Sequence, residues 1–259
     1  MNVNKLDQFF TTPEVAQECI QLIDNLDKYE TIIEPSAGNG SFSKLIPNCT
    51  AYDIMPMDNS IIKQDWLLYN NYHKENLLII GNPPFGTRSC LAKAFIRKSI
   101  EIGANCIAFI LPDTFNKLTM QNVFPDNWKL IVKHKISNEN FILPNGTNYF
   151  VPCSFYIWTN DNTQINLREK KYTCPTEFSF LKRGDLTADF TINGNNGRIK
   201  DISQVTNPKA EHYIRANSPN IRDELTKVNF NFNSSVNGGN AWIGQQDIIK
   251  AYLEYKNNS

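Results

Sequence analysis

The chain has 259 residues, equal numbers of acidic and basic side chains, and a hydrophobic fraction of 41%. This length suits one large α/β domain, or a domain of common size followed by a smaller one. The absence of a net charge excludes a global field that attracts nucleic acid. Binding of nucleic acid would therefore need local basic patches, or a protein partner that supplies basic surface.

The first residues lack the charged start and apolar run of a signal peptide, and no stretch is long and apolar enough to span a bilayer. The cysteines are scattered, without a C-x-x-C pair and without a histidine at zinc spacing. Cysteines scattered in this way are typical of proteins whose thiols stay reduced. We therefore expect an intracellular protein, cytoplasmic or nuclear, that has no metal site.

Helix and strand patterns alternate along the first half of the chain. Apolar residues at helical spacing follow Pro13, and short β-branched runs end at Pro35 and at Ile54. The run "NLLIIG" is apolar on both faces and ends at Gly81, as expected for a central parallel strand. A helix that Gly103 closes is predicted next.

The following segments continue the alternation. "CIAFILP" predicts a strand, and Asp113 is expected to cap a short helix after it. "WKLIVKHKI" and "VPCSFYIW" predict the last two strands, and Asn145-Gly146 between them is a hairpin signal. The alternation predicts a parallel, doubly wound α/β sheet, in which ligands bind at the carboxyl ends of the strands.

The character of the sequence changes after Thr163. Short polar segments with Gly-containing turns surround the strand-like pieces "ADFTI", "EHYIRA" and "KVNFNF", and "GQQDIIKAYLEY" predicts a closing helix. We therefore expect a ligand-binding domain over residues 1–163 and a smaller β-rich C-terminal region over residues 164–259. Basic clusters at 170–171, 182–183 and 198–200 would contact a nucleic-acid backbone, or they form ordinary solvated faces.

A glycine-containing turn, "EPSAGNG", follows the strand that ends at Pro35 and precedes a predicted helix, "SFSKLI". Gly38 and Gly40 let the backbone turn sharply and approach a ligand closely. The P-loop and G-x-G-x-x-G patterns are absent, so neither a triphosphate nor a dinucleotide is favoured. Glu34 would face a cationic ligand, and Asp53 would bind ribose hydroxyls. The alternatives are an ordinary strand-to-helix turn and a solvated aspartate.

Three segments in this order resemble one known family. "QFFTTPEVA", "EPSAGNG" and "NPPF" are similar to motifs of the class I, S-adenosylmethionine-dependent N6-adenine methyltransferases in which the cofactor motif precedes the catalytic motif. The resemblance covers roughly the first 160 residues. It implies a Rossmann-like, doubly wound seven-stranded sheet, S-adenosyl-L-methionine as cofactor, and methylation of adenine in DNA more than in RNA.

The resemblance also implies roles for residues at the strand ends. The cofactor would contact Phe10, Thr11, Thr12, Pro13, Glu34, Pro35, Ala37, Gly38, Gly40, Asp53, Ile54, Asp65, Trp66 and Asn82. Within that set, Asp65 would bind the cofactor's adenine amine, and Trp66 or Ile54 would pack on its ring. Asp65 as a turn cap and "FFTTP" as the lead-in and cap of the next helix are the alternatives.

The catalytic residues would be Asn82, Pro83, Pro84 and Phe85. The amide oxygen of Asn82 and the carbonyl of Pro83 can accept the two N–H bonds of an exocyclic amine, and these bonds strengthen as the nitrogen becomes positive. The prolines fix φ, and Phe85 would stack on the base, which contributes about 1–3 kcal/mol. A β-turn is the alternative, but a large aromatic residue is unusual there.

Substrate contacts are predicted for Phe85, Arg88 and Phe115. Arg88 would reach a phosphate, although capping of the next helix by Ser89 explains the same segment. Phe115 would line the pocket of a base flipped out of the duplex, or it packs in the core. The substrate class stays open, because RNA adenine methyltransferases and protein glutamine N5-methyltransferases share the Asn-Pro-Pro core. A non-catalytic cofactor-binding subunit is the alternative that is not an enzyme.

Overall fold

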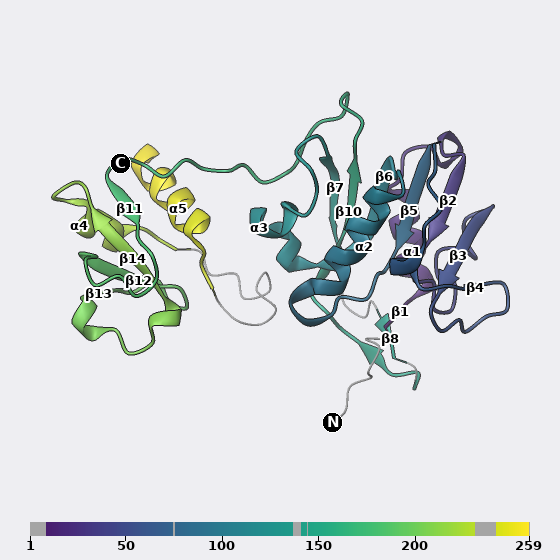
Figure 1. Cartoon of the computed structure of the whole chain (residues 1–259), viewed down its shortest axis with the longest axis horizontal. Helices are drawn as coiled ribbons and strands as arrows, with labels where there is room; N and C mark the ends of the chain where they lie inside the picture. Colours follow the sequence, from purple (N-terminus) through teal and green to yellow (C-terminus); the bar gives the residue numbers. More distant parts are fainter. Residues whose placement is uncertain (1–8, 75, 137–140, 144, 231–241, 259) are drawn as a thin grey trace. The chain divides into compact units, whose positions relative to one another are not determined.

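The computed structural model describes residues 9–74, 76–136, 141–143, 145–230 and 242–258. The chain folds as two compact units, Met1–Glu169 and Lys170–Ser259 (Figure 1). Within the described ranges, no helix is long and apolar enough to cross a membrane.

The first unit is built on a seven-stranded sheet of order β4-β3-β2-β5-β6-β10-β7. Its strands are β2 (Thr31–Glu34), β3 (Cys49–Asp53), β4 (Ile62–Lys63), β5 (Leu77–Gly81), β6 (Cys106–Pro112), β7 (Lys129–Lys135) and β10 (Cys153–Thr159). Strand β10 is antiparallel to both of its neighbours, and the β4-β3-β2-β5-β6 pairs are parallel. The predicted doubly wound α/β sheet is confirmed.

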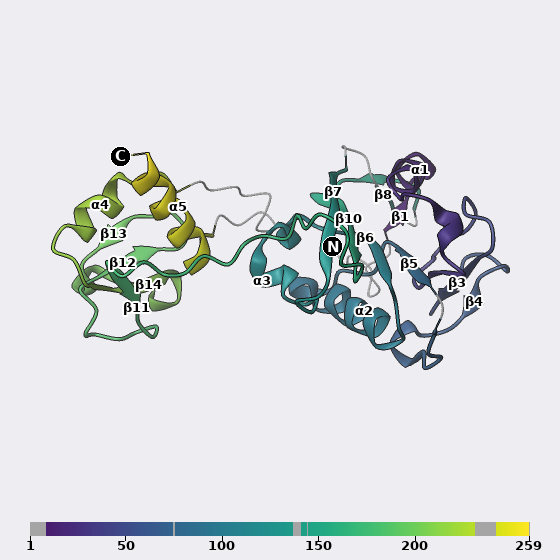
Figure 2. The ribbon, with the colours of Figure 1, turned by 90° about the horizontal axis from the view of Figure 1, so that it is seen from above.

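Helices cover both faces of this sheet (Figure 2). They are α1 (Pro13–Gln21), α2 (Cys90–Glu101) and the short α3 (Leu118–Gln121). Successive side chains of a strand point to opposite faces. Accordingly, Leu77 and Ile79 of β5 pack with the α2 residues, whereas Leu78 and Ile80 pack with the α1 residues. Burial on both faces explains why β5 is an unbroken apolar run.

A separate three-stranded antiparallel sheet joins the N-terminal segment to a hairpin. It consists of β1 (Phe10–Thr11), β8 (Phe141–Ile142) and β9 (Asn148–Tyr149). The turn at Asn145-Gly146 therefore connects β8 to β9, which form the predicted hairpin. This hairpin lies in the connection between β7 and β10, the antiparallel pair that corresponds to the two predicted last strands. Gly146 has a φ of +81°, which explains the preference for glycine there.

Two expected helical features differ in the structure. Residues 41–45 form successive turns and Ile46 a bend, instead of a helix, because Pro47 follows at once and disfavours helical geometry at Ile46. Asp113 does not cap the segment after β6. Its carboxylate is buried, accepts a hydrogen bond from Ser154 at 2.8 Å and pairs with the Lys135 ammonium. The sequence pattern cannot reveal these partners, which lie on other strands.

The second unit is a four-stranded antiparallel sheet of order β11-β14-β12-β13 packed against helices. Its elements are β11 (Phe178–Phe180), β12 (Phe190–Asn193), β13 (Ile199–Lys200), β14 (Glu211–Ala216), α4 (Ile221–Lys227) and α5 (Gln245–Asn257). The strand expected in "KVNFNF" is wrong over its described part. Lys227 ends α4, residues 228–230 are irregular, and the remaining residues lie outside the described ranges.

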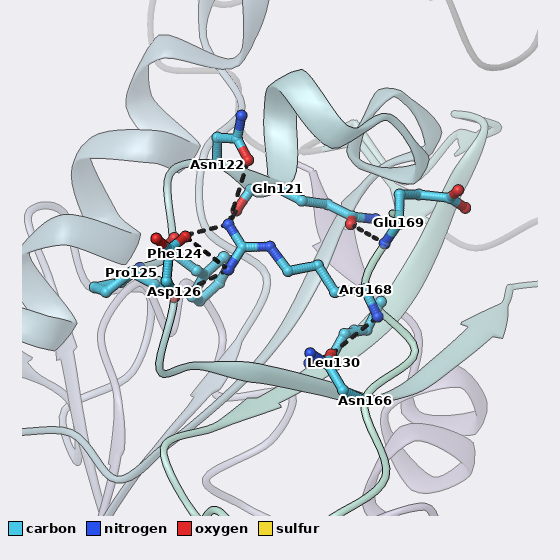
Figure 3. Close-up of polar contacts among 9 residues, drawn as sticks. All are labelled: Gln121, Asn122, Phe124, Pro125, Asp126, Leu130, Asn166, Arg168 and Glu169. Carbon is cyan, nitrogen blue, oxygen red and sulfur yellow. Dashed lines mark hydrogen bonds and ion pairs between the residues drawn. The ribbon is translucent and has the colours of Figure 1, made fainter. Parts of the chain in front are cut away.

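The first unit extends to Glu169, whereas the sequence places the boundary at residue 163. Main-chain and side-chain bonds attach the extra residues to β7: Leu167 N–H donates to Leu130 O at 2.7 Å, and Leu130 N–H donates to Asn166 Oδ1 at 3.2 Å. The Arg168 guanidinium donates to the carbonyls of Gln121, Phe124 and Pro125 (Figure 3). At two of these carbonyls the guanidinium adds to a backbone turn bond, since Gln121 O also accepts Phe124 N–H and Pro125 O also accepts Trp128 N–H, each at 3.0 Å.

Replacing Arg168 with alanine should destabilise the first unit by about 2–4 kcal/mol, because several charge-assisted hydrogen bonds are lost together. Denaturant unfolding followed by tryptophan fluorescence measures this, since Arg168 also lies 5.7 Å from the ring of Trp158. Arg97→Ala, at an exposed position on α2, is the matched control and should change stability by less than about 0.5 kcal/mol. Equal effects of the two substitutions would contradict the structural role of Arg168.

Candidate cofactor and catalytic site

A cavity of about 540 Å³ lies at the carboxyl ends of β2, β3 and β5. This volume is within the range of small-molecule sites. The predicted residues that line it are Phe10, Thr11, Glu34, Pro35, Ala37, Gly38, Asp53, Ile54, Asp65, Trp66, Asn82, Pro83, Pro84 and Phe85. The structure therefore brings together five separate segments of the sequence.

Other predicted site residues do not line the cavity. Thr12 accepts a hydrogen bond from Val15 N–H at 3.4 Å as the N-cap of α1, and Pro13 begins that helix. Gly40 forms the turn, with a φ of +80°. Thr12 and Pro13 therefore form the start of α1, as the capping alternative predicts.

Of the three residues predicted to contact the substrate, one lines the cavity and two lie elsewhere. Phe85 lines the cavity, but Arg88 is exposed on the turn before α2, and Phe115 is 1% exposed. The Phe115 ring packs against Tyr156, so core packing describes it. Ser89 occupies the N-cap position of α2 but makes no side-chain capping bond.

The glycine turn is fixed to the next strand through Asp53. Gly38 N–H donates to Asp53 Oδ2 at 2.7 Å, and Met55 N–H donates to Asp53 Oδ1 at 2.7 Å. Gly38 has a φ of +57°, and a Cβ there would lie 2.9 Å from the Phe10 ring. Both the backbone conformation and the close approach require glycine.

Glu34 ties the end of β2 to the segment after the turn. Its carboxylate is 2% exposed and accepts hydrogen bonds from Ser43 N–H at 2.8 Å and Phe42 N–H at 3.3 Å. Burial raises the pKa of Glu34 from 4.5 to about 7, against the opposing effect of these bonds. The carboxyl group therefore titrates near neutral pH.

We expect a proton linkage at Glu34 as a result. Its pKa is higher in the folded chain than in the unfolded chain, so ionisation costs stability as the pH rises from about 4.5 to about 7. A cationic ligand in the cavity would lower the pKa again, so its affinity should rise with pH across this window and then level off. Calorimetry in buffers of different ionisation enthalpy measures the released proton. Glu34→Gln should release none, and an unchanged proton release in that variant would rule out this linkage.

The charges around the cavity are of one sign. Glu34, Asp53 and Asp65 line it, and none of the described lining residues is Lys, Arg or His. The Asp65 carboxylate also accepts a hydrogen bond from Leu67 N–H at 2.9 Å, so Asp65 caps a short 3₁₀ turn, as the alternative in the sequence analysis predicts. An acidic, partly apolar cavity favours a cationic ligand and disfavours a phosphate.

Asn82 is held at the end of β5 with its acceptor unused. Its Nδ2 donates to Phe9 O at 3.2 Å, and its main-chain carbonyl accepts a hydrogen bond from Ser36 Oγ at 3.2 Å. Its Oδ1 is buried and has no partner among the described residues. An unpaired buried acceptor is costly, so this oxygen is available for a donor of a ligand.

Sequence reasoning missed several lining residues, including Phe9, Ser36, Ser41 and Cys90. Phe9 and Ser36 are direct neighbours of predicted residues, and extending each motif by one position would have found them. No motif in the sequence points to Cys90, because the turn before α2 is what brings this residue to the cavity.

The sheet order with one reversed strand, the acidic cavity at the glycine turn, and the Asn-Pro-Pro-Phe segment after β5 agree with a methyltransferase-like domain. Residues 26–189 match the family described as the EDM2 methyltransferase-like domain, and the chain belongs to that family.

Among curated proteins, the chain is similar to Protein ENHANCED DOWNY MILDEW 2 of Arabidopsis thaliana. The two are 29% identical over 160 residues, which cover 54% of this chain and 12% of that protein. The match thus spans a small part of the relative's length.

Solved structures with a similar fold include a putative RNA methyltransferase of Pyrococcus horikoshii (16% identity, TM-score 0.46, covering 61% of this chain and 91% of that one). Another is a putative class I S-adenosylmethionine-dependent methyltransferase of Listeria monocytogenes (13% identity, TM-score 0.46, covering 65% of this chain and 66% of that one).

Proposed function

We propose that the chain is an S-adenosylmethionine-dependent methyltransferase that acts on the N6 amine of adenine in DNA. The observation that carries this proposal is the buried, unpartnered Oδ1 of Asn82 beside an acidic cavity. The sequence "NPPF" and its position after β5 agree with the N6-adenine methyltransferase motif.

The residues present fit this cofactor. It carries a sulfonium and an ammonium group, and the charged side chains among the described lining residues are all acidic. Asp53 and Asp65 would bind its ribose and adenine amine, and Trp66 and Ile54 supply apolar surface for the ring. When bound, the cofactor supplies a methyl group on a positively charged sulfur. The phosphate-free character of the ligand agrees with the absence of a phosphate-binding motif.

Asn82 and Pro83 would act on the amine of the target base. The lone pair of an exocyclic amine is delocalised into the ring, so the amine is a weak nucleophile. Asn82 Oδ1 and the Pro83 carbonyl would each accept one N–H, which localises the lone pair and directs it toward the donor. The bonds strengthen in the transition state, so they increase the rate more than the affinity.

The neighbouring residues reduce the cost of this arrangement. Pro83 and Pro84 fix the backbone before binding, and Phe85 presents a ring in the cavity. No general base is needed, because the methylated ammonium product is acidic and loses its proton to water. This is consistent with the absence of His and Lys from the described lining residues.

The contact with nucleic acid would come from exposed basic residues and from a partner protein. Lys182 and Arg183 are exposed on the second unit, and Arg88 is exposed next to the catalytic segment. Lys200 is unavailable, because its ammonium lies 2.8 Å from the buried Glu211 carboxylate.

One experiment tests the proposal directly. The purified chain is incubated with radiolabelled cofactor and with plasmid DNA, total RNA or a protein extract, and the labelled product is identified after digestion. We expect N6-methyladenine from DNA. If N6-methyladenine forms in RNA alone, or if methylglutamine forms, the substrate is RNA or protein and not DNA. Cofactor binding without any transfer would indicate a non-catalytic subunit.

A further inference from the structure

We propose that Phe9 is a positioning residue: its main-chain carbonyl fixes which way the Asn82 amide faces, and strand β1 couples this orientation to the cofactor turn. This inference rests on the proposed function, because it concerns the same catalytic amide. It adds a residue outside the catalytic motif.

The first step is the geometry at Asn82. Its Nδ2 donates to Phe9 O at 3.2 Å, although the two residues are 73 positions apart in the sequence. A flipped amide would place Oδ1 against the Phe9 carbonyl, which puts two acceptors together and leaves that carbonyl without this donor. Both changes are unfavourable, because the flip brings two partial negative charges together and removes a hydrogen bond. The Phe9 carbonyl therefore selects the orientation that leaves Oδ1 free.

The second step is the attachment of β1 to the glycine turn. Ser41 Oγ donates to Thr11 O at 2.8 Å, and the Phe10 ring lies against Gly38. Thr12 then caps α1. Three consecutive residues after Phe9 are therefore held by the cofactor turn or by α1, so the position of the Phe9 carbonyl follows the position of the turn.

The third step is the other edge of β1. Phe10 pairs with Ile142 and Thr11 pairs with Phe141 of β8. The Phe9 ring also stacks on Tyr149 of β9, with a centroid distance of 5.2 Å and an interplanar angle of 22°. These contacts limit the movement of the segment from its second side. Its carbonyl is a fixed acceptor, as positioning of a catalytic group requires.

The decisive variant is Asn82→Asp. A protonated aspartic acid can donate its O–H to Phe9 O and keep a free carbonyl oxygen, whereas the ionised form places negative oxygens against Phe9 O. We expect the transfer rate of N82D, divided by the wild-type rate at the same pH, to rise at least 10-fold as the pH is lowered through the variant's pKa. A ratio that is flat, or that rises with pH, would overturn the proposal.

A second measurement does not depend on activity. The Asn82 side-chain amide signal is assigned in the ¹H–¹⁵N spectrum by its loss in Asn82→Ala, and its hydrogen exchange is followed with cofactor bound. We expect one protected proton in the wild type and at least 5-fold faster exchange in Ser41→Ala, which loses the bond to Thr11. Ser60→Ala, whose exposed hydroxyl bonds only to Asp58, is the matched control and should leave the exchange unchanged.

The two measurements separate this inference from the proposed function. An unprotected Asn82 amide, or equal exchange in the Ser41 and Ser60 variants, overturns the positioning role even if the wild type methylates DNA. Protection with the expected difference supports it even if the substrate proves to be RNA or protein.

Discussion

Asn82→Ala should reduce the rate of methyl transfer about 100- to 1000-fold, the loss typical of removing one hydrogen-bonding group that stabilises a transition state. The variant lacks the unpartnered Oδ1 that would accept an amine N–H, and the Pro83 carbonyl alone would then orient the nucleophile. Single-turnover transfer of labelled methyl groups to DNA measures the chemical step directly.

Cofactor affinity should change little in the same variant. The acidic side chains of the cavity, Glu34, Asp53 and Asp65, are unaltered, and β1 keeps its own contacts with the cofactor turn through Ser41 and Gly38 when the bond to Asn82 is lost. Asn59→Ala, at an exposed position on the loop after β3, is the matched control and should transfer at the wild-type rate. A rate for Asn82→Ala within 10-fold of the wild type would remove the amide from the mechanism.

The central strands and the residues at their ends could be predicted from the sequence because the signals are local. The run at β5 is apolar on both faces and stops at Gly81, so the residues after it had to lie at the carboxyl edge of the sheet. The same reasoning places Glu34 at the end of β2 and Asp53 at the end of β3. Since parallel neighbouring strands end at one edge, the three segments meet.

Contacts between distant segments could not be predicted. The helical spacing around Phe115 does not show that its ring turns into the core against Tyr156. Likewise, nothing near Phe9 indicates that its carbonyl binds Asn82, and nothing near Arg168 indicates carbonyls at the end of α3. Each depends on packing between elements, which competes with and overrides local preference.

Gly38→Ala should weaken cofactor binding about 10- to 100-fold. Alanine at a φ of +57° costs roughly 1–2 kcal/mol, and its Cβ would lie 2.9 Å from the Phe10 ring. The turn must move to relieve both, which breaks the 2.7 Å bond between Gly38 N–H and Asp53. Asp53 would then no longer be held at the cavity wall. Each 1.4 kcal/mol corresponds to a tenfold change in the dissociation constant, which calorimetry with the cofactor measures.

Gly184→Ala is a control that measures the backbone cost at a position outside the cavity. Gly184 has a φ of +83°, but a Cβ there has no atom within 4 Å, so this variant carries the backbone cost alone. It should lower the unfolding free energy by about 1–2 kcal/mol without changing cofactor affinity. If both variants bind the cofactor as the wild type does, the close approach of Phe10 to the turn has no part in the site. A loss confined to Gly38→Ala would show that the cofactor turn itself requires glycine, and that a loss of stability elsewhere in the chain does not weaken cofactor binding.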